Sequence, residues 1–170
     1  DLTEEEILAT RDTQLLTAKP MLTVVNVSED EVSKREPKQN EVIISAKIES
    51  ELSELPEAEA KEMLKELGMH QTGLDKLIVA SYKLLNLITF FTAGPMESKA
   101  WTITTGTKAP QAAGVIHTDF EKGFIRAEVI SYQDFVDCHG ESGARDKGKL
   151  RTEGKTYEMR DGDVCHFLFN

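Results

Sequence analysis

The segment from Trp101 to Glu128, WTITTGTKAPQAAGVIHTDFEKGFIRAE, most constrains the fold because its order of residue types fits no single amphipathic element. Its first residues alternate between apolar and polar side chains, which predicts a half-buried strand. Residues 109–113 then predict a short helical turn, since Pro110 is tolerated where a first-turn N–H has no partner. A second strand is expected at 124–130. Two strands therefore flank a compact polar crossing.

The rest of the second half predicts a small mixed sheet with a helix across it. Strands are expected at residues 88–93, 99–104, 123–130, 156–159 and 164–169, and helices at 109–115 and 132–144. The run from Arg160 to Asp163 contains turn-forming residues and predicts a hairpin between the last two strands.

The first half contains two short apolar runs, Met21 to Val27 and Val42 to Ser45, each bounded by polar residues. Such runs predict strands buried on both faces, as in a parallel sheet. Ligands of α/β folds bind beyond the carboxyl ends of parallel strands. The connection between the runs is short and polar for the usual crossover helix, and it contains Pro37. Either the crossover is shortened or residues of the parent protein are missing from this chain.

Helical periodicity follows these strands. Residues 52–67 place apolar side chains on one broad face and end at Gly68, while residues 73–87 predict a second helix. Residues 1–13 predict the end of another helix. We therefore expect an α/β domain over residues 1–87 and a small α+β domain over residues 88–170.

Charge and cysteine content limit the classes of partner. The 30 acidic and 20 basic residues give a net charge of −10, divided as −8 (10 basic, 18 acidic) over residues 1–87 and −2 (10 basic, 12 acidic) over 88–170. This balance argues against bulk-charge binding to DNA, and a polyanion would prefer the second half. Cys138 and Cys165 have no metal-site spacing, and no apolar run approaches the roughly 20 residues that span a bilayer. A reduced cytoplasmic protein without membrane contact is expected.

Several segments resemble a known family. The run FFTAGPMESKAWTITTGTKAPQAAGVIHTDFEKGFIRAEVISYQDF, the ending EGKTYEMRDGDVCHFLFN, and the upstream segments LLTAKPMLTVVNVSED and SAKIESEL are similar to the YchF / Obg-like ATPase family, whose members are P-loop nucleoside triphosphatases. The resemblance implies that residues 1–87 are the last part of an Obg-type nucleotide-binding domain. It also implies that residues 88–170 are a TGS domain with the β-grasp, ubiquitin-like fold.

The same resemblance implies a base-binding edge. Asn26, Val27 and Glu29 stand where related GTPases carry their guanine-reading motif, and Ser45 and Ala46 stand in the second base-contacting loop. A glutamate at position 29 removes the guanine-specific aspartate, while the Asn26 amide could contact adenine N6 and N7 together. We expect ATP to be favoured, with GTP possible. Taken as isolated residues, Asn26 and Ser45 could equally be loop caps.

The 170-residue sequence lacks the motif that binds the phosphates for nucleotide hydrolysis. No GxxxxGK[ST] motif occurs in the 170 residues, so the phosphate cradle and the Mg²⁺-binding hydroxyl are not among them. The resemblance implies a parent ATPase with Mg²⁺, but this chain alone is expected to be inactive. No catalytic or metal-binding residue is predicted in it.

Ribosome or RNA contact is the partner that the resemblance implies. The candidate basic contacts are Lys108, Lys122, Arg126, Arg145, Lys147, Lys149, Arg151 and Lys155. Charge alone favours the simpler interpretation that these basic side chains are only exposed to solvent. Two alternatives stay open: a β-grasp module that binds RNA or protein without any nucleotide role, and a small enzyme that uses His117 beside Asp119 and Glu121. For His117 a structural or recognition role is favoured.

Overall fold

The computed structural model describes residues 3–10, 13–94 and 97–170, without the side chains of Glu4 and Ile7. The chain divides into two compact units, residues 1–85 and 86–170. Together they form a mixed α/β structure with one parallel and one mixed sheet. Each unit is described on its own.

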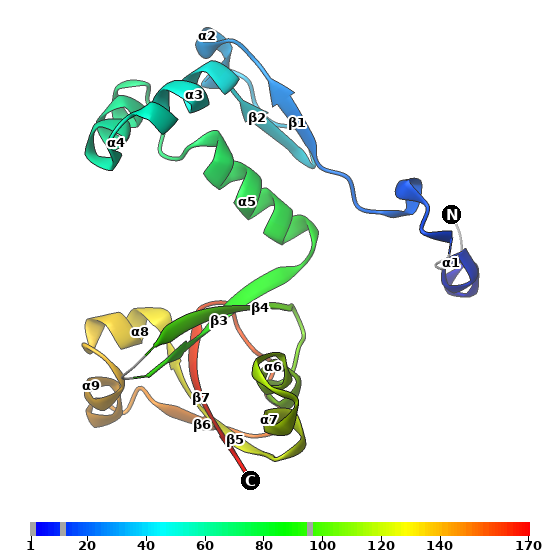
Figure 1. The fold of residues 1–170 in the computed structure, drawn as a ribbon, viewed down its shortest axis with the longest axis vertical. Coiled ribbons are helices and arrows are strands. Elements are labelled where there is room, and N and C mark those ends of the chain that lie inside the picture. Colours follow the sequence, from blue (N-terminus) through cyan, green and yellow to red (C-terminus); the bar gives the residue numbers. More distant parts are fainter. Residues whose placement is uncertain (1–2, 11–12, 95–96) are drawn as a thin grey trace. The chain divides into compact units, whose positions relative to one another are not determined.

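The sheet of the first unit consists of two parallel strands, β1 (Thr23–Asn26) and β2 (Glu41–Ile44) (Figure 1). Thr23 pairs with Glu41 and Asn26 with Ile44, so the two carboxyl ends lie together. The predicted parallel pair is confirmed. The prediction that both strands are buried is wrong for β1, because Val24 is 44% exposed.

The connection between these strands contains a single helical turn, α2 (Glu29–Val32). The remaining residues up to Asn40 form turns and extended chain. This confirms the prediction that no ordinary crossover helix fits there. Arg35 and the main chain of Lys38 both bind the Glu41 carboxylate, at 2.7 and 2.9 Å, and so fix the connection to the start of β2.

Three further helices complete the first unit: α3 (Ala46–Glu54), α4 (Glu57–Glu66) and α5 (Gly73–Leu84). The single helix predicted over 52–67 is wrong, because Leu55 is extended and Pro56 stands at the N-cap of α4. A small core forms around buried apolar side chains of Val32, Ile43, Ile48, Leu52 and Met69. Preceding β1 are α1 (Glu4–Thr10) and the 3₁₀ helix η2 (Leu16–Ala18).

The start of α5 is tied to α3 by one carboxylate. Glu49 accepts hydrogen bonds from the main-chain N–H groups of Gly73 (2.6 Å) and Leu74 (3.3 Å). Thr72 and Asp75 cap the same helix reciprocally. These bonds satisfy N–H groups that a helix start otherwise leaves without partners.

The second unit is built on a five-stranded sheet with the order β4-β3-β7-β5-β6. Its strands are β3 (Leu87–Ala93), β4 (Ser98–Thr104), β5 (Phe124–Ser131), β6 (Arg151–Glu153) and β7 (Asp163–Phe169). The first and last strands, β3 and β7, are parallel neighbours, and the other pairs are antiparallel.

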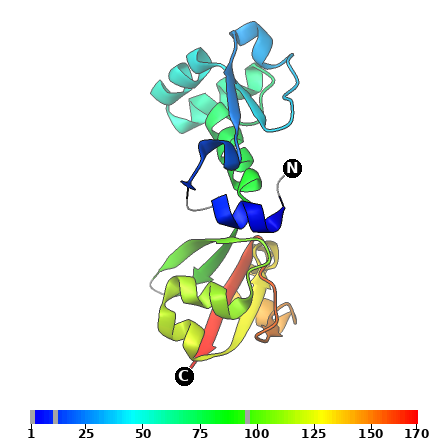
Figure 2. The same cartoon turned by 90° about the vertical axis from the view of Figure 1, so that its right-hand side faces the viewer.

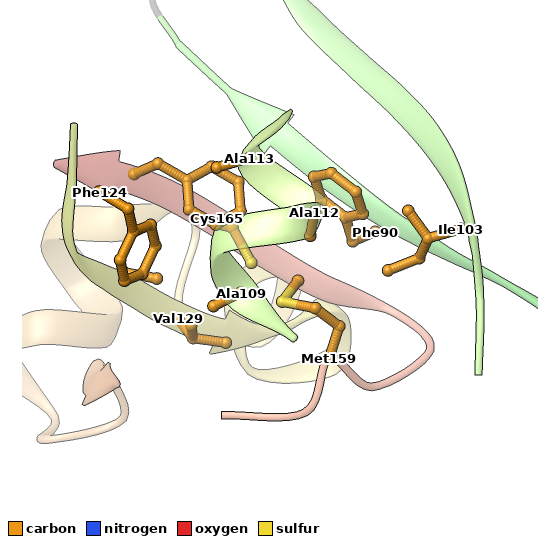
Figure 3. Close-up of a cluster of buried hydrophobic side chains, with 11 residues drawn as sticks. Phe90, Ile103, Ala109, Ala112, Ala113, Phe124, Val129, Met159 and Cys165 are labelled. Atoms are coloured by element: carbon orange, nitrogen blue, oxygen red, sulfur yellow. The ribbon is translucent and has the colours of Figure 1, made fainter. Parts of the chain in front are cut away.

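Helices α6 (Ala109–Ile116) and α7 (Thr118–Lys122) lie over one face of this sheet (Figure 2). Ala109, Ala112 and Ala113 are fully buried, and their small side chains let α6 approach Phe90 and Phe124 of the sheet (Figure 3). Helices α8 (Tyr132–Asp137) and α9 (Glu141–Asp146) lie on the opposite side, where Ile130, Cys138 and Ala144 form a smaller core.

Three local predictions for this unit are wrong. Residues 156–159 form no strand and make only a bridge between Lys108 and Glu158, whereas the short strand β6 was missed. Because no strand directly precedes the turn at residues 160–163, this turn leads into β7 without forming the predicted hairpin. The helix predicted over 132–144 is two helices, because His139 and Gly140 have φ values of 57° and 111°.

Both cysteines of the second unit are buried. Burial, reinforced by the nearby Asp163 carboxylate, raises the pKa of the Cys165 thiol, so little nucleophilic thiolate forms near neutral pH. We expect iodoacetamide to leave both thiols unmodified in the folded chain and to modify both after denaturation, as measured by mass spectrometry. Rapid modification of Cys165 in the folded chain would contradict this packing.

Candidate nucleotide-base edge and RNA-facing surface

The side chain of Asn26 joins the two loops that follow β1 and β2. Its Oδ1 accepts a hydrogen bond from the main-chain N–H of Ala46 at 2.9 Å. One residue later, the Val27 N–H donates to the Ile44 carbonyl, also at 2.9 Å. The structure thus brings Asn26, Val27 and Ala46 together at the carboxyl end of the parallel strands, where ligands of α/β sheets bind.

This bond changes how the Asn26 amide could read a base. The predicted two-point contact with adenine needs the amide oxygen to accept from N6. That oxygen already accepts from Ala46, whereas Asn26 as a whole is exposed. The amide nitrogen remains as the donor, and its natural acceptor on a purine is N7, which adenine and guanine share. An amide that donates to N7 alone fits a purine without choosing between the two, and one lone pair of Oδ1 is already used by the Ala46 N–H.

Ser45 lies in the predicted loop after β2, but its side chain is almost fully buried. It stands at the N-cap of α3 but makes no capping bond through its side chain, and only 2% of the residue is exposed. Its main-chain oxygen accepts from the Glu49 N–H at 3.0 Å. The surface of this loop is therefore presented by Ala46, which is exposed, and the Ser45 hydroxyl is left with almost no area for a ligand to touch.

Glu29 is engaged by Lys47, a residue that was not among those predicted from the sequence. The Lys47 Nζ lies 2.5 Å from Glu29 Oε1, and this hydrogen bond and the opposite charge raise the pKa of Lys47. Both side chains are substantially exposed. Lys47 directly follows Ala46 in the SAK segment, which was the available clue. The pair therefore engages the Glu29 carboxylate, the acceptor predicted at this position.

Three of the predicted RNA contacts are already paired within the second unit. Arg145 binds Glu128 and Glu141, Lys149 lies 3.3 Å from Asp134, and Arg151 binds Glu153 and Asp163. These cations have structural partners close by, so they add less positive potential to the surface than their number suggests.

The other predicted contacts are more available. Among the described parts of the chain, no ion pair involves Lys108, Lys122, Arg126, Lys147 or Lys155, and all five are exposed. They come from separate elements: the start of α6, the end of α7, strand β5, the end of α9 and the turn after β6. These five cations are thus exposed on several different elements of the second unit.

His117 acts as a helix cap. Its Nδ1 accepts a hydrogen bond from the Asp119 main-chain N–H at 3.2 Å, at the start of α7. The imidazole is 60% exposed, with the Asp119 carboxylate 3.5 Å away. A nitrogen held by the main chain is a poor general base. This capping geometry favours a structural or recognition role for His117 over a small enzyme built on it.

One group of side chains has the composition of a metal site. Within the described ranges, Glu128, Glu141 and His166 bring one ligand atom each to within 4.8 Å of the others. The Arg145 guanidinium donates to both carboxylates, at 3.2 and 2.9 Å. A bound metal ion would have to displace this cation, so the group is already satisfied as an ion-pair cluster.

None of the helices in the described ranges is both long and apolar enough to cross a bilayer.

The chain is similar to known proteins along its whole length. Residues 87–170 match the family model YchF-GTPase_C, described as a protein of unknown function (DUF933). The chain is 48% identical over 186 aligned residues to the ribosome-binding ATPase YchF of Bacillus subtilis, covering 100% of this chain and 50% of that protein. It is 44% identical to Obg-like ATPase 1 of Rattus norvegicus, covering 100% of this chain and 46% of that protein.

Solved structures agree with the sequence relatives. The structure of the Schizosaccharomyces pombe YchF GTPase superposes with a TM-score of 0.82 at 40% identity, covering 99% of this chain and 48% of that one. The chain thus spans about half the length of the relatives it matches. It belongs to the YchF / Obg-like ATPase family, and residues 87–170 are its YchF-GTPase_C domain.

Proposed function

We propose that this chain supplies the base-facing edge of a purine nucleotide site, together with a ribosome-contacting domain, to an Obg-like ATPase. The hydrogen bond between Asn26 Oδ1 and the Ala46 N–H is the observation that carries the first part. It connects the two loops at the ends of parallel strands and leaves the amide nitrogen as a donor. The printed names of the relatives, a ribosome-binding ATPase and Obg-like ATPase 1, support the class of activity.

The phosphate side of the site would come from other residues. The 170-residue sequence has no glycine-rich phosphate loop, so the groups that hold the β- and γ-phosphates and Mg²⁺ would lie in the half of the relatives that this chain does not span. Mg²⁺ would neutralise charge on the transferring phosphoryl group. Hydrolysis is accordingly proposed for the full-length protein and not for this chain alone, with the cytoplasm, where ribosomes work, as its location.

The preference between purines follows from Glu29. Guanine presents N1–H and an N2 amino group, which need an acceptor carboxylate, and adenine presents no such pair. Lys47 holds the Glu29 carboxylate at 2.5 Å. We therefore expect the full-length protein to bind ATP several-fold more tightly than GTP.

Lys47→Met tests this explanation, because it frees the Glu29 carboxylate at small cost to an exposed ion pair. The ratio of the ATP and GTP affinities, measured by calorimetry, should fall several-fold. Lys61→Met is the matched control, since Lys61 forms an exposed pair with Glu57 at the same 2.5 Å on α4. Equal ratios in wild type and Lys47→Met would contradict the role of the pair.

The second unit is proposed to be a TGS domain with the β-grasp fold. Its sheet order, the parallel pairing of the first and last strands, and α6 across one face support that assignment. We propose that this domain meets the ribosome. Co-sedimentation of the chain with ribosomes, in rising salt, tests the contact, and failure to co-sediment even at low salt would remove it.

The competing function is a binding module without a nucleotide role. It predicts that ribosome binding by the full-length protein is the same with ATP, with ADP and without nucleotide. The proposed function predicts a measurable difference among these three states, because an ATPase that binds the ribosome couples the two ligands reciprocally when its conformation depends on both.

A further inference from the structure

A shallow hollow of about 470 Å³ lies where α7 meets the end of β7. Its lining combines an aromatic ring from Phe169, a cation from Lys122, a carboxylate from Asp119, and the chain at Gly123 and Asn170. None of the nucleotide-edge residues is part of it. This mixture of ring, cation and acceptor is the chemistry that recognises an unpaired nucleotide.

The Phe169 ring is held in place from one side. It stacks on Phe120 with ring centroids 3.9 Å apart and an interplanar angle of 25°. Phe120 itself packs against the main core, and its ring lies 6.0 Å from that of His117. Phe169 is nevertheless 42% exposed. A fixed, exposed aromatic ring offers a stacking surface without a further loss of side-chain entropy.

The main chain beneath the ring is also fixed. The Asn170 N–H donates to the Gly123 carbonyl at 3.0 Å. A Cβ atom at position 123 would overlap the Asn170 carbonyl oxygen, so this close approach requires glycine. The hollow is therefore part of the folded sheet end and is present before any ligand binds.

The polar groups suit a nucleotide better than a peptide. Lys122 has no ion-pair partner among the described residues and could meet a phosphate, while Asp119 could accept from an exocyclic amino group. An extended peptide would gain its affinity from an open strand edge, and one edge of β7 is paired with β5 as far as Phe169. A single exposed ring also offers little apolar area for a protein partner.

We propose that this hollow binds one unpaired nucleotide of single-stranded RNA, with its base stacked on Phe169 and its phosphate near Lys122. The inference rests on the proposed ribosome contact for its choice of RNA, and it names the part of the second unit that makes the contact. It predicts a preference for unpaired strands, because a base inside a duplex cannot reach the ring.

The test measures binding of the 170-residue chain to a short fluorescein-labelled RNA by anisotropy, as a single strand and annealed to its complement. The single strand should bind at least several-fold more tightly. Phe169→Leu keeps an apolar contact with Phe120 but removes the ring, and should weaken single-strand binding about tenfold. Lys122→Gln should weaken it and reduce its salt dependence.

Lys65→Gln is the matched control, since Lys65 is also exposed and has no ion-pair partner among the described residues, but lies on α4 and is not a predicted RNA contact. It should leave single-strand binding near the wild-type value. Equal binding of duplex and single strand, or equal losses in Lys122→Gln and Lys65→Gln, would overturn the proposal. Thermal unfolding of Phe169→Leu checks its fold. If Phe169→Leu is unstable, the exposed substitution Lys122→Gln alone tests RNA binding in the hollow.

Ribosome co-sedimentation of the same variants separates this inference from the proposed function. If the chain binds ribosomes and neither Phe169→Leu nor Lys122→Gln weakens ribosome binding or RNA binding, nucleotide binding in the hollow is refuted. The proposed ribosome contact then stands. If RNA binding depends on Phe169 and Lys122 but no variant or wild-type chain co-sediments with ribosomes, the ribosome contact is refuted and the hollow stands.

Discussion

Replacing Asp163 with alanine should lower the free energy of unfolding of the second unit by about 2–4 kcal/mol. Asp163 is 2% exposed, and its carboxylate accepts from Tyr157 OH and the Arg160 N–H, both at 2.9 Å, and from Arg151 at 3.3 Å. Alanine would leave all three donors without this acceptor. The side chain of Arg151 is 36% exposed, so water can replace part of the loss, and we place the effect below that of a fully buried pair.

The measurement is thermal unfolding followed by tryptophan fluorescence. Trp101 is the only tryptophan and lies in β4, so its signal reports on the second unit. For a domain of this size the expected free-energy change lowers the Tm by about 10–25 °C.

Two milder variants test whether the acceptor itself causes that loss. Tyr157→Phe removes one hydroxyl and should cost about 1 kcal/mol, and Asp163→Asn keeps one acceptor and should fall between the two. A Tm of Asp163→Ala within a few degrees of wild type would contradict the central position of this network.

Replacing Asn26 with aspartate should weaken ATP binding by the full-length protein about tenfold or more. The substitution keeps an oxygen that can accept from the Ala46 N–H, so the bond between the two loops can persist. It removes the amide donor and places a negative charge where N7 presents its lone pair. The affinity is measured by calorimetry, and circular dichroism confirms the fold.

Asn26→Ala is the informative companion variant. It removes both the donor and the bond to Ala46, so it should weaken binding at least as much as aspartate. If Asn26→Asp bound ATP as tightly as wild type while Asn26→Ala did not, only the connection between the loops would matter, and the donor would have no role at the base.

The sequence predicted the parts of the fold that depend on local pattern. The apolar runs at β1 and β2 and the alternation around Trp101 are periodic signals, and the structure has strands at each. The breaks at Pro56 and at His139 were missed because apolar periodicity continued across them. Tyr157 and Met159 alternate like a strand, yet Tyr157 is half-buried and binds Asp163, and Met159 is buried in the main core.

The sequence predicted which residues belong to the candidate site but not which of their atoms would be available to a ligand. The NVSE and SAK segments pointed to Asn26 and Ala46, which the structure brings together. Which atom of Asn26 is used, and the burial of Ser45, depend on how two loops 20 residues apart meet, and no local pattern records that. The stack of Phe120 on Phe169 likewise joins α7 to β7 and has no signature in either segment.

The most direct test of the nucleotide edge compares ATP with 7-deaza-ATP, which lacks the N7 acceptor, in the full-length protein. We predict that wild type binds ATP about tenfold more tightly than 7-deaza-ATP, and that Asn26→Asp binds the two with nearly equal affinity. Equal affinities for both nucleotides in the wild-type protein would show that Asn26 does not donate to the base, and would contradict the proposed base-facing edge.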